Sequence, residues 1–211
     1  RTSRFPDHLI GKSGGIAMYK TVKSIRVCAL ILSILALSFG TALAQSSQPA
    51  SMVKTSNNDQ NTDRGVVEVA FGSQSVSIDY GRPQLKGRDM LAQAPDGFVW
   101  RFGSNASTTV ETTADLMFGA KKLSKGKYSA WLKHVGGDRW ALIFNSEVGG
   151  WGAGAGAAKR ENDVLEVPFM YSKGSKSVER FTVDIMNHGG DNGHMLATWG
   201  THRLETTFKF N

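Results

Sequence analysis

Cysteine is almost absent from this sequence of 211 residues. The single cysteine, Cys28, lies inside a short apolar run near the start of the sequence, so the chain after that run contains none. A domain without cysteine forms no disulfide, carries no thiolate nucleophile and binds no zinc through sulfur. We therefore expect the fold to depend on the packing of an apolar core, for which the sequence is long enough.

A hydrophobic run long enough to cross a membrane is also missing. The apolar run at residues 27–39 is shorter than the roughly 20 apolar residues that a helix needs to span a bilayer. A basic segment from Met18 precedes this run, and small side chains at Ala42 and Ala44 follow it. This order is typical of a secretory signal peptide over residues 18–44, cleaved near Ala44. It predicts a periplasmic or secreted protein with no stable membrane span after cleavage.

The residues before Met18 give no sign of structure or of a cofactor site. We interpret residues 1–17 as an over-extended start without a structural role. Gly11-Lys12-Ser13 resembles the end of a phosphate-binding loop, but that loop requires a glycine five residues before Gly11, where Pro6 stands. We expect no cofactor here or elsewhere in the sequence.

A strong excess of positive charge is missing once the leader is set aside. The whole chain has 25 Lys and Arg residues against 18 Asp and Glu residues, a net charge of +7. Residues 1–44 hold six of these cations and one of the anions, which leaves a net charge of +2 for the rest. A nucleic-acid-binding domain normally carries a basic patch or stripe. We therefore expect no nucleic acid as a partner.

The sequence does contain a regular series of short alternating segments. Residues 45–65 are polar and predict a flexible tail. Apolar and polar residues alternate from there on, with glycine-rich turns between the segments, which predicts strands with one buried face. We expect an all-β domain over residues 66–211, an antiparallel β-sandwich of about nine strands, immunoglobulin-like or jelly-roll-like. The predicted strands lie near residues 67–71, 76–80, 98–102, 128–133, 140–145, 164–170, 181–185, 195–199 and 204–210.

Polar residues that suit ligand recognition are densest between residues 82 and 111. Arginine, asparagine and threonine together can bind a carboxylate, a phosphate or sugar hydroxyls. We predict a ligand-binding site with Trp151 at its rim; its residues are Arg82, Arg88, Arg101, Asn105, Thr108, Glu111 and Trp151. The alternative is structural: Arg101 pairs with Glu111 or Asp115 and fixes a loop, while Asn105 forms a turn.

Several motifs in the same region resemble a known family. They are Tyr80-Gly81-Arg82-Pro83, Lys86-Gly87-Arg88, Val99 to Asn105, Leu123 to Tyr128 and Trp140 to Asn145, in this order. Together they resemble the secreted bacterial family called domain of unknown function 2911. The resemblance implies an extracytoplasmic β-domain and supplies no established activity. Ser104 stands where the family usually has alanine.

Two histidines flank a glycine-rich turn near the end of the sequence. His188, Asp191 and His194 form the alternative prediction of a metal site, since imidazole and carboxylate bind zinc or copper. Their spacing fits no standard metal motif, and Gly-Gly-Asp-Asn-Gly is also typical of a hairpin turn. Our main prediction is therefore no metal.

Three hypotheses for the function follow. The first is a non-catalytic binding or envelope-associated module for a polar or anionic ligand, namely a glycan, a peptide or a small anion. The second is a hydrolase acting on envelope polymers, although the sequence has no Gly-x-Ser-x-Gly motif. The third is a self-assembling structural protein, because a Gly/Ala-rich loop follows Trp151.

Overall fold

The computed structural model describes residues 54–56 and 64–211, and it places side chains in the second of these ranges. The predicted start at residues 1–17, the signal peptide at residues 18–44 and most of the polar tail lie outside the described residues. The strands are β1 (Lys54–Ser56), β2 (Arg64–Phe71), β3 (Gln74–Gly81), β4 (Val99–Trp100), β5 (Thr108–Thr112), β6 (Leu116–Phe118), β7 (Lys121–Leu123), β8 (Gly126–Gly136), β9 (Arg139–Asn145), β10 (Asp163–Asn187) and β11 (Asn192–Phe210). Two 3-10 turns, η1 (Gly154–Gly156) and η2 (Arg160–Asn162), precede β10.

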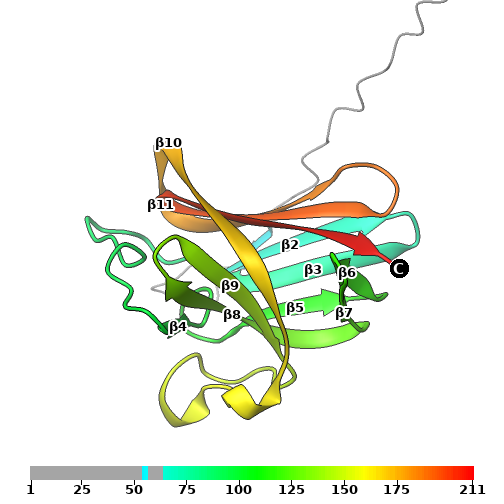
Figure 1. Cartoon of the computed structure of the whole chain (residues 1–211), viewed down its shortest axis with the longest axis horizontal. Coiled ribbons are helices and arrows are strands. Elements are labelled where there is room, and N and C mark those ends of the chain that lie inside the picture. Colours follow the sequence, from blue (N-terminus) through cyan, green and yellow to red (C-terminus); the bar gives the residue numbers. More distant parts are fainter. Residues whose placement is uncertain (1–53, 57–63) are drawn as a thin grey trace, which may run out of the picture. The chain divides into compact units, whose positions relative to one another are not determined.

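The prediction of an all-β antiparallel fold is confirmed. All strand pairs are antiparallel, and the strands follow the order β1-β2-β3-β5-β8-β9-β10-β11-β6-β7, with β4 attached to β8 (Figure 1). No helix within residues 54–56 and 64–211 is long and apolar enough to cross a membrane.

The described strands form one sheet that folds back on itself around a single core. Phe71 of β2 and Phe208 of β11 are far apart in the strand order, yet their ring centroids are 5.8 Å apart. Tyr80 of β3 contacts Phe181 of β10 across the same core, with centroids 5.8 Å apart. The inward faces of the first and last strands therefore pack together, which is the packing expected of a sandwich.

Alternation of apolar and polar residues explains the strands that the sequence predicted well. In β2 the side chains of Val67, Val69 and Phe71 are buried and their neighbours are more exposed. In β3 Val76 and Ile78 follow the same rule. Each strand thus contributes one apolar face to the core, as period two requires.

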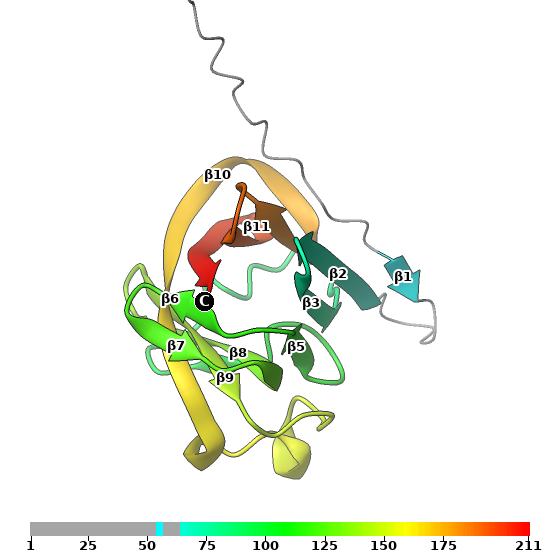
Figure 2. The ribbon, with the colours of Figure 1, turned by 90° about the vertical axis from the view of Figure 1, so that its right-hand side faces the viewer.

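The prediction of separate strands at residues 164–170, 181–185, 195–199 and 204–210 is wrong. These segments join into the two long strands β10 and β11, which form a ribbon (Figure 2). Gly200 has a φ of 63° at the middle of β11, a conformation that glycine adopts without steric cost. The ribbon doubles back there, so the Phe210 amide donates to the Asp191 carbonyl oxygen at 2.9 Å.

The predicted strand at residues 98–102 is also shorter than expected. Only Val99 and Trp100 pair with β8, since the chain turns at Phe102, whose φ is 51°. The Phe102 ring is nevertheless fully buried, and the turn is held by the Thr108 hydroxyl, which donates to the Phe102 carbonyl oxygen at 2.6 Å. The strands β5, β6 and β7, which the sequence did not predict, follow this turn.

Candidate functional site

Three of the predicted site residues meet at a junction between two loops. The Arg101 guanidinium donates through Nη1 to the Asn105 carbonyl oxygen at 3.1 Å, and the Gly152 amide donates to the same oxygen at 3.1 Å. Ala106 pairs with Trp151 in an isolated β-bridge. A Cβ at Gly152 would overlap the Arg101 side chain, so the arginine stem lies against the Gly152 backbone. The junction therefore holds the loop around residues 101–107 against the loop around residues 150–152.

The remaining predicted residues lie apart from this junction. Thr108 is buried under Phe102, whereas Glu111 is exposed and pairs with Lys127 at 3.3 Å. The Arg82 Nη2 donates to the Thr182 hydroxyl at 3.4 Å, while Arg88 is exposed on the following loop.

The structural alternative is partly confirmed. Asn105 has a φ of 61°, as expected of a turn. The expected partners of Arg101 are wrong, because Glu111 pairs with Lys127 and Asp115 pairs with Lys122 at 3.1 Å. Arg101 instead binds a backbone oxygen of its own loop.

The family-like motifs pack these loops closely. A Cβ added at Gly81 would lie 2.2 Å from the Ser104 carbonyl oxygen, so only glycine fits there. The Tyr80 hydroxyl accepts a hydrogen bond from the Val183 amide at 3.0 Å and ties the same motif to β10. The Ser104 hydroxyl is buried and has no hydrogen-bond partner. Packing of the fold thus accounts for much of this motif.

The histidines of the alternative metal site do not surround a common point. The rings of His188 and His194 stack with centroids 5.6 Å apart, and His194 Nε2 lies 3.1 Å from a carboxylate oxygen of Glu205. Asp191 is exposed, and its carbonyl oxygen accepts the Phe210 amide. Throughout residues 64–211, the side chains form no group of three or more His, Cys, Asp or Glu residues that could hold a metal ion.

A cleft that the sequence did not predict lies over β9 and β10. Its volume is about 600 Å³. Trp140 and Phe169 line it from the inward faces of their strands, and Met170, with 65% of its surface exposed, lies at its edge. The full lining consists of Lys121, Val135, Asp138, Arg139, Trp140, Ala141, Glu166, Val167, Pro168, Phe169, Met170 and Tyr171. An apolar surface with a few charged groups around it is typical of a small-molecule site.

The cleft lies where β10 separates from β11. Ala141 of β9 pairs with Pro168, whereas the pairing of β10 with β11 begins only at Met170. Proline has no amide hydrogen to donate, and it suits a strand position without a second neighbour. Pro168 thus lies at a local edge, which opens the sheet beside the cleft.

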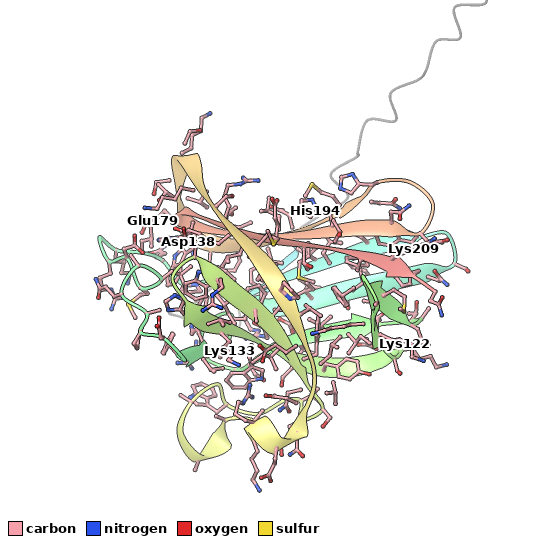
Figure 3. The ribbon with its side chains drawn as sticks, viewed as in Figure 1. Lys122, Lys133, Asp138, Glu179, His194 and Lys209 are labelled. Carbon is pink, nitrogen blue, oxygen red and sulfur yellow. The ribbon has the colours of Figure 1, made fainter. Side chains whose placement is uncertain are left out.

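Two more hollows lie on the other side of β10. One has a volume of about 540 Å³ and shares Val167, Pro168 and Met170 with the cleft. It reaches His194, and Figure 3 shows His194 on the opposite side of β10 from Asp138 and Lys133. The other hollow, of about 660 Å³, surrounds the turn at His188. The cleft differs from both in having Trp140, Phe169 and Tyr171 together with four charged side chains.

The charges at the cleft leave a small positive excess. The Lys133 Nζ lies 3.0 Å from a carboxylate oxygen of Glu166, which it neutralises. The Lys121 Nζ donates to the Glu166 backbone oxygen at 2.7 Å and keeps its charge. Lys121 and Arg139 are thus two cations against the single carboxylate of Asp138.

A hydrogen-bonded relay reaches the cleft from behind. The Tyr171 hydroxyl and His202 Nδ1 are 3.0 Å apart, and His202 Nε2 is 2.7 Å from Asp89 Oδ1. Partial burial raises the pKa of Asp89, but hydrogen bonds from the Ala92 amide and from His202 outweigh it and leave the pKa below its usual value. Burial raises the pKa of Tyr171, and the negative charges of Asp138 and Asp89 raise it further. Tyr171 lines the cleft and therefore connects the relay to it.

A second histidine fixes the rim of the cleft. His134 Nδ1 is 3.1 Å from the Pro95 carbonyl oxygen, and Nε2 is 2.8 Å from the Gly137 carbonyl oxygen. Burial lowers the pKa of His134, but hydrogen bonds to these carbonyls and the nearby Asp96 carboxylate outweigh it and raise the pKa above its ordinary value. The imidazole thus ties the loop before β4 to the turn between β8 and β9.

Comparison with known proteins identifies one family. Residues 62–208 match the family described as "Protein of unknown function (DUF2911)". No curated protein matches the chain, and no solved structure matches it.

Proposed function

This chain belongs to the DUF2911 family, and from the geometry of its cleft we propose that it is a binding module for a small anion with an apolar body. This ligand is a narrower class than the polar or anionic ligand that the sequence predicts. We assign its binding to residues of β9 and β10 rather than to the arginine-rich loops. The basic, apolar and small-residue order of residues 18–44 supports action outside the cytoplasm.

The observation that carries the proposal is the cleft itself. Its volume of about 600 Å³ lies within the range of small-molecule sites, which runs from roughly 300 to 1,000 Å³. Met170 is the most exposed large apolar side chain among the described residues. An apolar ligand body over Met170 and Pro168 would remove this surface from water, which favours binding.

The charges around the cleft favour an anionic group on that ligand. Lys121 and Arg139 exceed the remaining carboxylate of Asp138 by one charge. The Arg139 Nε lies 3.4 Å from the Gly136 carbonyl oxygen, a long contact that leaves the other guanidinium nitrogens available in the cleft. A guanidinium binds a carboxylate or sulfonate through two parallel hydrogen bonds.

The contacts of His134, His194 and His202 count against a hydrolase in which one of these three histidines activates a serine. His134 binds two backbone carbonyls and His194 binds a carboxylate. His202 binds a carboxylate and a phenol. A hydrolase that acts through an activated serine needs a histidine beside that hydroxyl. The hydrolase and self-assembly hypotheses remain predictions from the sequence.

The test is a fluorescence titration with anilinonaphthalene sulfonate, an anion with an apolar body. We expect Met170→Gln to weaken its binding by about tenfold, because burial of a methionine side chain contributes roughly 1.5 kcal/mol. Val164→Gln is the matched control, since Val164 is an exposed apolar residue of the same strand outside the cleft. It should leave the affinity unchanged.

A second pair of variants tests the anionic group. Arg139→Gln should weaken binding by several-fold and reduce its dependence on salt, because a charge contact is lost. Lys176→Gln removes one positive charge from an exposed position of β10 outside the cleft and should have no effect. Arg88→Gln separates the two sites: if it weakens binding and Arg139→Gln does not, the ligand binds at the arginine-rich loops and the proposal is wrong.

A further inference from the structure

The relay behind the cleft has a defined arrangement of protons. A carboxylate such as Asp89 can only accept a hydrogen bond, so His202 Nε2, 2.7 Å away, must carry a hydrogen. A neutral imidazole that carries its hydrogen on Nε2 has a bare Nδ1. The Tyr171 hydroxyl, 3.0 Å from Nδ1, therefore donates its only hydrogen to His202.

This arrangement determines what Tyr171 can offer to a ligand. With its hydrogen directed to His202, the phenol presents only lone pairs to the cleft, and these repel an anion. When a proton is added at Nδ1, both ring nitrogens of His202 donate, Nε2 to Asp89 and Nδ1 to the Tyr171 oxygen. The Tyr171 hydrogen is then free to turn to the cleft and donate to an anionic oxygen.

Charged groups on the neighbouring segments surround the relay of Asp89, His202 and Tyr171. Asp89, from the loop after β3, places its carboxylate directly against the His202 imidazole. Lys173 of β10 lowers the pKa of Asp89 and so favours its carboxylate form, whereas Asp138 of the turn between β8 and β9 raises the pKa of Tyr171. His202 itself is 5% exposed, which limits competition from water.

We propose that the cleft takes up one proton when it binds an anion, with Tyr171 as the donor to the anionic group and His202 as the site of the added proton. This inference rests on the proposed function. Tyr171 then selects ligands by hydrogen bonding. Anions bind with proton uptake, and ligands that donate a hydrogen bond to the phenol bind without proton uptake.

Calorimetric titration with anilinonaphthalene sulfonate tests the proposal in buffers of different ionisation enthalpy. We expect the wild-type protein to take up as much as one proton, and its affinity to rise by as much as tenfold per pH unit on acidification. Tyr171→Phe should reduce both effects, since a phenyl ring has no hydrogen to donate. His134, which stacks on Trp140, also titrates near the cleft, but Tyr171→Phe leaves it in place, so the comparison isolates the relay.

A second variant keeps the proposal testable if Tyr171→Phe does not fold. Asp89 is half exposed on its loop, and Asp89→Asn should reduce the proton uptake because it removes the charge that stabilises the imidazolium. If both variants take up the same number of protons as the wild type, the inference is wrong and the proposed function stands. If Met170→Gln binds the probe as tightly as the wild type, both are wrong.

Discussion

The imidazole of His134 stacks on the indole of Trp140, with ring centroids 4.4 Å apart. Both ring nitrogens of His134 point at backbone carbonyls, which only accept hydrogen bonds. The ring satisfies both only when it carries two hydrogens and a positive charge. The rim of the cleft is therefore held by a histidine whose charged form fits the fold better than its neutral form.

The stability of the protein should depend on pH through His134. Its pKa in the folded protein is raised above the ordinary value of 6.5. The stabilisation is therefore complete below about pH 6.5 and is lost as the pH rises through the raised pKa. We expect the free energy of unfolding to exceed that of His134→Phe at low pH, by roughly 1.5–3 kcal/mol for hydrogen bonds to a charged group. Denaturant titrations of both proteins between about pH 5.5 and pH 8.5 measure this difference. A difference that stays constant over this range would contradict the prediction.

Replacing Ser104 with alanine should stabilise the protein. The Ser104 hydroxyl is buried without a partner, and an unsatisfied buried polar group costs about 1–3 kcal/mol. Thermal unfolding of Ser104→Ala should therefore occur at a higher temperature. Ser129→Ala is the matched control, because the buried Ser129 hydroxyl accepts the Trp131 indole hydrogen at 2.9 Å and its loss should lower the unfolding temperature. Equal effects of the two variants would show that the Ser104 hydroxyl is satisfied.

Gly81 should tolerate no larger side chain. A Cβ there would lie 2.2 Å from the Ser104 carbonyl oxygen and 2.6 Å from its amide nitrogen, and both are backbone atoms. We expect Gly81→Ala to reduce the free energy of unfolding by at least about 1–3 kcal/mol. At Gly174 the nearest atom, 3.1 Å away, belongs to the flexible Arg203 side chain. Gly174→Ala should therefore reduce the free energy of unfolding much less than Gly81→Ala. A comparable reduction in both variants would show that the steric clash at Gly81 is not the cause.

The fold could be predicted wherever local alternation decides the structure. Val67, Val69 and Phe71 identify β2 because each buried side chain is two residues from the next. The continuity of β10 and β11 could not be read in this way. The middle of β10 is exposed and polar, and the doubling back of β11 at Gly200 depends on contacts such as that between Gly193 and the Phe208 ring.

The candidate site was harder to predict than the fold. Asp89, Tyr171 and His202 come from a loop and two strands, and no spacing in the sequence relates them. One local signal existed: Met170 and Val164 occupy polar-side positions of an alternating strand, which exposes them. Pro168 between them marked the place where the sheet opens. The arginines suit ligand recognition by their chemistry, but residue type alone does not distinguish a side chain that binds a ligand from one that holds a loop.

The most direct test of the cleft is methyl NMR of the methionines during titration with anilinonaphthalene sulfonate. Met170 lies at the edge of the cleft, whereas Met117 lines the hollow around the turn at His188. We predict that the Met170 methyl signal shifts with the titration and that the Met117 signal stays in place. A shift at Met117 with no change at Met170 would show that the anion binds elsewhere and would contradict the account.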